Sequence, residues 1–436
     1  MLSIKTNIQN KNWLKYIIKQ FKTINLADFD IEIISLDGKE KYENIVYYLD
    51  SYKKDSVNIF NSKEVMPNGN VEYLKKELYV LENTRNDIFD INYDIFWNAF
   101  VFLSRYEEYL SEQNGSNIYS YSLNHPRLDK KSFNIPIVNV LFNELERFLV
   151  KNFYDLQFGD KQAHIIDLSH DVDYINKTIQ LRLKQTAFNL FNTLKSARDP
   201  GRFMRNSIKT VKFAFSNPSY WCFDYWAKLE EGHGHRSVFY IYAKYGSQSF
   251  KSWLLDPSYD IKSNIKLQNK LKELYNKGFD IGLHGSYDSA KSFEKLKNEK
   301  DILEQSLGIE IKKTRQHWLN YFEKITPKIH ENLFKYDSTL AWNDRMGFRS
   351  GTASAYSPYN FEKQEEYRYQ IIPQVIMDSN IYDYSDSVEI FNEAKIVMQK
   401  SKDLSKTTHI SISWHQRVCN SDYNWNKFYE EIISDI

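Results

Sequence analysis

The sequence predicts an α/β protein with a distorted (β/α) barrel in the C-terminal two thirds of the chain and a smaller α/β domain in front. Two observations support this class. The length of 436 residues exceeds what one hydrophobic core usually organises. Short apolar stretches at 164–173, 237–243, 279–284 and 409–415 are separated by helix-like stretches, and this alternation is typical of β/α folds.

The first part of the chain contains both strand-like and helix-like patterns. Stretches at 31–34 and 46–49 predict strands, whereas apolar spacing over 95–110 and 138–153 predicts helices. The domain boundary is expected near Gly159, which gives an α/β accessory domain over residues 1–158 and a barrel domain over residues 159–436.

The second part of the chain shows a repeated order of strand, then helix. Helix-like stretches at 261–277 and 292–307 separate the apolar stretches. In a β/α barrel, chemistry gathers at the C-terminal ends of the strands. The segment 177–225 is basic and helix-prone, and we interpret it as a helical insertion that decorates the surface.

Composition and charge exclude several classes of protein. Lys and Arg total 58 against 57 Asp and Glu, so the net charge of +1 gives no sustained field to attract nucleic acid or an anionic membrane. Cys222 and Cys419 are too few for a disulfide framework and favour a reducing compartment. No secretory signal is recognised, and no run reaches about 18 apolar residues. We therefore expect a cytoplasmic protein without a transmembrane segment or a nucleic-acid partner.

Acidic residues and a histidine follow two of the expected barrel strands. Asp171 and Asp173 lie two apart at a strand end, where both carboxylates can point into one pocket, one to bind a metal and the other to take a proton. His284 ends a later strand, and Asp288 lies four residues on. Asp173, His284 and Asp288 offer nitrogen and oxygen ligands suited to Zn²⁺ or a similar divalent ion.

Two further residues complete the expected chemistry. Arg315 follows the run 309–313, and its guanidinium can hold a carboxylate in a fixed orientation. His415 ends the stretch at 409–415 and can protonate a leaving amine, because imidazole titrates near neutral pH.

These residues, in this order, resemble the motifs of the NodB-homology polysaccharide deacetylases of carbohydrate esterase family 4, over about residues 160–436. The resemblance implies that Asp171 is the catalytic base and that Asp173 and His284 are metal ligands. Asp288 stands where the family has a second histidine ligand. Arg-Gln-His-Trp at 315–318 and Ser-Trp-His at 413–415 match the third and final motifs.

The last two motifs imply that Arg315 orients the base and that His415 is the general acid. The resemblance also implies a set of residues on the substrate side: His317, Trp318, Asp337, Arg349 and Trp414.

The function implied is metal-dependent hydrolysis of the acetamide of an N-acetylated sugar or surface-glycan precursor, with Zn²⁺ as the expected metal. Two other classes stay open. A non-catalytic carbohydrate-binding pseudo-deacetylase, suggested by Asp288 and the altered third motif, predicts a sugar pocket without a tightly held metal. An interaction scaffold, working through the N-terminal domain and the 177–225 insertion, predicts an exposed apolar patch on those regions. The oligomeric state is left open.

Overall fold

The structure, a computed structural model, describes residues 1–63, 89–127, 130–246, 249–382 and 388–435. The chain divides into two compact units, each made of segments distant in sequence. The first unit contains Met1–Ile166, Tyr321–Ile376 and Tyr384–Ser411, and the second contains Asp167–Asn320, Met377–Asp383 and Ile412–Ile436. The domain boundary expected near residue 159 stays a prediction.

Within the described part of the first unit, four strands form a sheet in the order β2-β1-β3-β4. All three neighbouring pairs run parallel, and Ile4 of β1 lies between Ile33 of β2 and Val46 of β3. The strands expected at 31–34 and 46–49 are thus confirmed. The elements of this unit are β1 (Leu2–Thr6), α1 (Asn12–Ile24), β2 (Ile31–Ser35), β3 (Asn44–Leu49), β4 (Val57–Phe60), α2 (Ile95–Leu103), α3 (Tyr106–Gln113), η1 (Ser122–Asn124), η2 (Lys130–Asn134), α4 (Ile137–Asn152), α11 (Thr326–Leu333), β9 (Tyr336–Asp337), β10 (Tyr359–Asn360), β11 (Glu365–Glu366), β12 (Gln370–Ile371) and α13 (Val388–Leu404).

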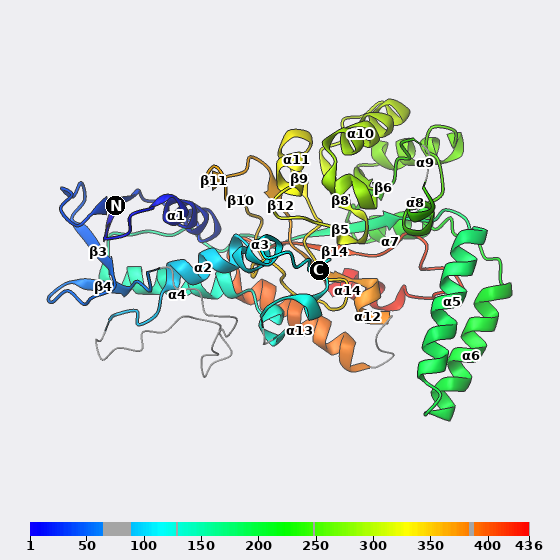
Figure 1. The fold of residues 1–436 in the computed structure, drawn as a ribbon, viewed down its shortest axis with the longest axis horizontal. Helices are drawn as coiled ribbons and strands as arrows, with labels where there is room; N and C mark the ends of the chain where they lie inside the picture. Colours follow the sequence, from blue (N-terminus) through cyan, green and yellow to red (C-terminus); the bar gives the residue numbers. More distant parts are fainter. Residues whose placement is uncertain (64–88, 128–129, 247–248, 383–387, 436) are drawn as a thin grey trace. The chain divides into compact units, whose positions relative to one another are not determined.

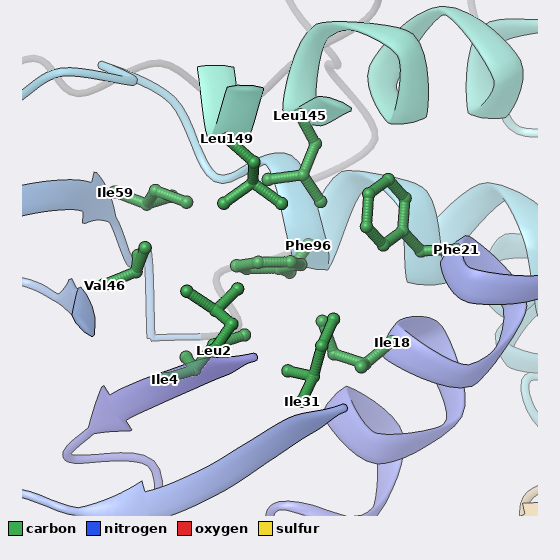
Figure 2. A pocket seen from close by; sticks show the side chains of 10 residues that line it. All are labelled: Leu2, Ile4, Ile18, Phe21, Ile31, Val46, Ile59, Phe96, Leu145 and Leu149. Atoms are coloured by element: carbon green, nitrogen blue, oxygen red, sulfur yellow. The ribbon is translucent and has the colours of Figure 1, made fainter. Parts of the chain in front are cut away.

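The core of this sheet is built from aliphatic side chains and Phe21, packed around Phe96. Figure 2 shows them pointing toward one another from the strands and from α1, α2 and α4. Phe96 lies among them with 1% of its surface exposed. The side chains drawn are Leu2, Ile4, Ile18, Phe21, Ile31, Val46, Ile59, Phe96, Leu145 and Leu149.

The helix expected over 95–110 is wrong as one continuous element, because α2 ends at Leu103 and α3 begins at Tyr106. Arg105 between them has a φ of 61°, a left-handed conformation that interrupts helical hydrogen bonding. Its buried guanidinium forms ion pairs with Glu108 and Glu323. The helix expected over 138–153 is confirmed as α4.

The second unit alternates strands with helices, which confirms the α/β class. Among the residues described, the larger sheet has eight strands, and six of these, in the order β8-β7-β6-β5-β14-β13, contribute residues to this unit. The pairs β5/β6, β6/β7 and β7/β8 are parallel. Closure of the sheet into a barrel stays a prediction. The elements are β5 (Ile165–Val172), α5 (Ile179–Lys195), α6 (Pro200–Phe215), α7 (Phe223–Gly232), β6 (Val238–Ile241), α8 (Phe250–Leu255), α9 (Ile265–Asn276), β7 (Asp280–Gly285), η3 (Tyr287–Lys291), α10 (Phe293–Leu307), β8 (Lys313–Gln316), η4 (His317–Leu319), β13 (Gln374–Met377), α12 (Asp378–Tyr382), β14 (His409–Ser413) and α14 (Lys427–Asp435).

The register of the parallel strands brings chemically active residues to one edge. Asp171 on β5 pairs with Tyr240 on β6, and His284 on β7 pairs with Arg315 on β8. Gly282 on β7 lies beside Tyr240, where a Cβ would come within 2.6 Å of the tyrosine ring. The absence of a side chain at Gly282 lets this ring lie 4.3 Å from the Arg315 guanidinium.

No helix in the described ranges has the length and apolar composition needed to cross a bilayer. Cys222 and Cys419 are both free thiols. The cytoplasmic location stays a prediction.

The Phe96→Ala substitution tests the packing of the N-terminal sheet. We expect it to lower the free energy of unfolding by about 3–5 kcal/mol, because it leaves a cavity among side chains that cannot fully collapse. Urea denaturation measures the change. The matched control is Leu123→Ala, since Leu123 is 77% exposed, and it should change stability by less than about 0.5 kcal/mol. Equal effects of the two substitutions would contradict this account of the core.

Candidate metal centre and active site

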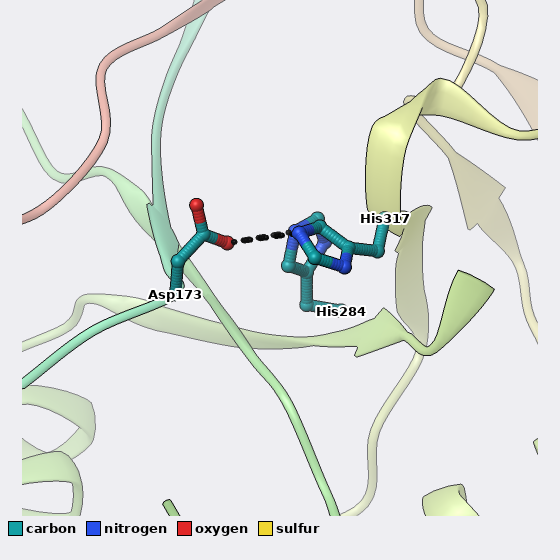
Figure 3. Close-up of side chains that lie close together, drawn as sticks. All are labelled: Asp173, His284 and His317. Carbon is teal, nitrogen blue, oxygen red and sulfur yellow. Dashed lines mark ion pairs between the residues drawn. The ribbon is translucent and has the colours of Figure 1, made fainter. Parts of the chain in front are cut away.

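Three buried side chains of the second unit converge at the edge where β5, β7 and β8 end. Asp173, His284 and His317 each offer one ligand atom, and these atoms all lie within 4.8 Å of one another (Figure 3). Asp173 Oδ1 is 3.4 Å from His284 Nε2 and 3.6 Å from His317 Nε2. One carboxylate oxygen therefore faces two imidazole nitrogens.

The hydrogen bonds behind the two imidazoles fix their tautomers. His284 Nδ1 is 3.0 Å from the Arg315 carbonyl oxygen, which can only accept, so Nδ1 carries the proton. His317 Nδ1 is 3.2 Å from Asp256 Oδ1. Burial alone would raise the pKa of Asp256, but its contact with His317 lowers it, so the carboxylate is ionised and accepts. In the neutral rings, both Nε2 atoms then point lone pairs at Asp173.

Asp173 Oδ1 is buried and accepts no hydrogen bond. Three lone-pair atoms that face one another cannot stabilise each other, so a proton or a metal cation has to lie between them. A two-histidine, one-carboxylate set with ring nitrogens fixed from behind is suited to a divalent metal with open positions. The residues present therefore fit a divalent metal ion.

The second oxygen of Asp173 is already engaged, so the carboxylate offers one oxygen to a metal. Oδ2 accepts a hydrogen bond from Arg417 at 2.8 Å and lies 3.4 Å from His415 Nε2. Burial would raise the pKa of Asp173, but the charges of His415 and Arg417 hold it well below its usual range. The carboxylate is ionised, as a metal ligand must be.

Asp171 is held by a buried arginine. Arg315 donates to Asp171 Oδ1 at 2.7 Å and to the hydroxyl oxygens of Ser413 at 2.7 Å and Ser169 at 2.9 Å. Although burial would raise the pKa of Asp171, the Arg315 charge lowers it below the ordinary value. An oriented, ionised carboxylate at this position can accept a proton.

His415 is held from behind by Asp378. Its Nδ1 lies 2.8 Å from Asp378 Oδ1, and its backbone N–H donates to Asp378 Oδ2 at 2.8 Å. Burial opposes protonation of His415, but the Asp378 charge prevails and raises its pKa to about 9. The imidazolium can therefore donate a proton near neutral pH.

Sequence reasoning missed Asp256, Asp378 and Arg417. Asp378 directly follows the apolar strand β13, the same order of strand and acid that drew attention to Asp171, so a signal was present. Asp256 lies in a loop before Pro257, and Arg417 lies two residues after His415. Neither position has a pattern that distinguishes it from ordinary surface charge.

Asp288, expected as a metal ligand, is not in the cluster, and His317, expected on the substrate side, is. The short helix η3 carries Asp288, whose carboxylate is 46% exposed and lies 2.7 Å from Lys251 Nζ. His317 instead follows β8 directly and reaches the cluster from η4. A spacing of four residues does not specify which way a turn directs its side chains, so the sequence alone could not decide between these two residues.

Two of the expected substrate-side residues belong to the first unit. Asp337 is fully buried, with Oδ2 3.0 Å from His330 Nδ1. Arg349 donates to Glu108 Oε2 at 2.7 Å and to the Ser120 hydroxyl at 2.7 Å. Both side chains form buried polar contacts within that unit.

The two expected tryptophans differ in exposure. Trp414 has 0% of its surface exposed, and its indole N–H donates to the Trp425 carbonyl at 2.6 Å, so its ring offers no face to a ligand. Trp318 is 42% exposed and lies 5.8 Å from the His317 ring, centroid to centroid. Trp318 alone of this pair can contact a sugar.

A polar cavity of about 430 Å³ adjoins Asp173 within the second unit. It lies between the segment after β5 and the loop before α9, and most of its side chains carry hydroxyl, amide or carboxylate groups. Its lining residues are Asp173, Tyr174, Ile175, Asn176, Thr178, Ser258, Tyr259, Asp260, Ser263, Asn264 and Ile265. Such a lining is suited to a polyhydroxylated ligand.

A buried carboxylate supports the turn that follows His284. Glu299 on α10 accepts hydrogen bonds from the backbone N–H of Ser286 at 3.0 Å and from its hydroxyl at 2.5 Å. Burial raises the pKa of Glu299 to about 7, more than these hydrogen bonds lower it.

Comparison with known proteins gives one family match and several remote structural likenesses. Residues 2–154 match the model of a family described as "Family of unknown function (DUF7033)". No curated protein matches the chain. Solved structures with similar backbones include a protein classed as a polysaccharide deacetylase from Mycobacterium smegmatis, at 13% identity, covering 64% of this chain and 85% of that chain with a TM-score of 0.39.

Two further solved structures have backbones that are similar at the same remote level. One is classed as a polysaccharide deacetylase of O-antigen biosynthesis from Bordetella bronchiseptica, with 12% identity, 58% and 71% coverage and a TM-score of 0.27. The other is a mutant of a pseudoenzyme of carbohydrate esterase family 4 with restored enzymatic activity, with 8% identity, 70% and 77% coverage and a TM-score of 0.29. Likenesses this remote assign no chemistry to this chain.

The His317→Ala substitution tests the third ligand. We expect near-stoichiometric zinc in the wild-type protein after supplementation and at least a tenfold loss of zinc affinity in the variant, because one of three protein ligands is removed. Elemental analysis after dialysis against a metal buffer measures it. The matched control is Asp288→Ala, which should keep the metal. Loss of metal in the control with retention in His317→Ala would overturn the ligand assignment.

The Glu299→Gln substitution tests the buried carboxylate through the pH dependence of stability. The folded-state pKa lies above the unfolded one, so the folded state binds the proton more tightly. Wild-type stability should then fall as pH rises from about 4.5 to 7, by about 3 kcal/mol in total from this group. Glu299→Gln should lose this component, as measured by urea denaturation at several pH values. Parallel curves for the two proteins would contradict the shift.

Proposed function

We propose that the second unit is a metal-dependent deacetylase that hydrolyses the acetamide of an N-acetylated sugar or surface-glycan precursor. One observation carries the proposal. The potential ligand set of Asp173, His284 and His317 shares one buried site with an arginine-held carboxylate, Asp171, and a carboxylate-held imidazolium, His415. Amide hydrolysis needs a base and an acid beside an electrophilic centre, and a binding protein needs neither.

The division of roles follows from the partners of each group. Bound at Asp173, His284 and His317, a divalent metal, with zinc proposed, would polarise the amide carbonyl and acidify a water molecule. Asp171 takes the proton from the attacking water, and Arg315 keeps its carboxylate ionised and oriented.

His415 completes the reaction at the nitrogen. Its imidazolium donates a proton to the amide nitrogen as the carbon–nitrogen bond breaks, which gives acetate and a free amine. Asp378 holds His415 Nδ1 and so directs Nε2 toward the site. Trp318 supplies an apolar wall for a pyranose ring, and the polar cavity beside Asp173 supplies hydrogen-bonding groups for its hydroxyls.

The Asp171→Asn substitution separates the base from the metal ligands. We expect it to lower kcat for acetate release by about 10²–10⁴-fold, because the amide cannot accept the proton. The metal content should be unchanged, since Asp171 is outside the ligand set. Mass spectrometry of N-acetylated mono- and oligosaccharides incubated with the zinc-loaded protein measures turnover. The matched control is Asp288→Asn, for which kcat should stay within about twofold.

The alternatives give different results in the same experiment. Wild-type protein that holds no zinc and releases no acetate from any N-acetylated sugar, while still binding one in calorimetry, would favour the pseudo-deacetylase. Absence of both metal and sugar binding would overturn the deacetylase and the sugar-binding alternative together.

A further inference from the structure

Two long antiparallel helices, α5 and α6, are inserted in the second unit soon after Asp173 (Figure 1). The Thr193 and Thr210 hydroxyls meet at 3.2 Å between the helices. The base of this hairpin is fixed by an ion pair between Lys177 and Asp422 at 2.8 Å, with both side chains fully buried. The hairpin is therefore an ordered part of its unit.

Each helix of the hairpin carries a stripe of exposed, bulky apolar side chains. On α5 they recur at intervals of four, seven and four residues, and on α6 at four, three and four, so each set lies on one helical face. Every one is more than half exposed, and Phe215 reaches 84%. The stripes consist of Ile179, Leu183, Leu190 and Leu194 on α5, and Met204, Ile208, Val211 and Phe215 on α6. This confirms the exposed apolar surface that the scaffold alternative predicted for the insertion.

The same hairpin concentrates positive charge. Residues 179–215 contain eight Lys and Arg and one acidic residue, Asp199, whereas the whole chain carries a net charge of only +1. The exposed cations of the hairpin are Lys195, Arg198, Arg202, Arg205, Lys209 and Lys212. The near-neutral total thus conceals a local excess of about seven positive charges.

We propose that the α5–α6 hairpin docks on the surface of an anionic lipid bilayer. Bulky apolar side chains beside Lys and Arg are the composition of helices that lie in the headgroup region, where apolar groups enter the acyl boundary and cations meet lipid phosphates. A second copy of the hairpin is a poor occupant, because it would bring together two surfaces of the same strong positive charge. The positive charge and the apolar stripes of the hairpin both favour an anionic bilayer surface as the partner.

Docking is separate from the proposed deacetylase function, because it involves no residue of the metal centre. The experiment is sedimentation of the full-length protein with sucrose-loaded vesicles of phosphatidylcholine and phosphatidylglycerol, and with vesicles of phosphatidylcholine alone. We expect the wild-type protein to partition at least tenfold more strongly to the anionic vesicles, and this preference to weaken as salt is raised.

Two sets of substitutions separate the charge from the apolar stripe. Arg202→Glu, Arg205→Glu and Lys209→Glu together should reduce partitioning to anionic vesicles at least tenfold. Met204→Gln, Ile208→Gln and Phe215→Gln together should do the same with the charge retained. All six side chains are exposed, so folding should be unchanged, as checked by circular dichroism.

The matched controls are exposed residues on other helices of the same unit. Lys228→Glu, Lys266→Glu and Lys272→Glu control for charge, and Tyr275→Gln with Phe293→Gln controls for apolar surface. Partitioning of the control proteins should equal that of the wild type. Equal binding of hairpin and control variants, or no binding by the wild type, would overturn the proposal. A dimer that the apolar hairpin variant dissociates, without vesicle binding, would overturn it in favour of self-association.

Discussion

The arrangement of the candidate site depends on the contacts of one buried group, the guanidinium of Arg315. From β8, the guanidinium donates hydrogen bonds to the carboxylate of Asp171 and to the hydroxyls of Ser169 and Ser413. The backbone carbonyl of Arg315 accepts a hydrogen bond from Nδ1 of His284. One residue thus positions the proposed base, sets the tautomer of a proposed ligand and links three other strands. Removing a buried charge with this many partners leaves several polar groups unsatisfied at once.

The strand ends of the second unit could be read from the sequence because parallel strands deliver side chains to a common edge. Asp171, Asp173, His284 and His415 follow apolar runs, and the structure places them with Arg315 in one unit around one buried site. This pattern is local in sequence and repeats along the chain, so it can be recognised without knowledge of tertiary contacts.

The rest of the candidate site depends on side-chain geometry that the spacing of residues in the sequence does not encode. Whether Asp288 or His317 joins Asp173 is decided by the direction of a short turn, and Asp337 and Arg349 pair with neighbours that only folding brings near. Asp256 and Asp378 contact the Nδ1 atoms of His317 and His415, on the side of each ring that faces away from Asp173. Their roles can therefore be recognised only once the ring orientations are known. The basic character of the segment 177–225 was visible in the sequence, whereas the exposure of its apolar side chains became visible only in the fold.

The engagement of Asp173 Oδ2 by Arg417 has a thermodynamic consequence for metal loading. The carboxylate cannot swing to chelate through both oxygens, and the two imidazoles are fixed from behind, so the conformational entropy of ordering the ligands is lost during folding rather than on ion capture. Ion affinity and conformational stability are then linked quantities. Occupancy would shift the unfolding equilibrium of the second unit in proportion to the logarithm of free metal concentration.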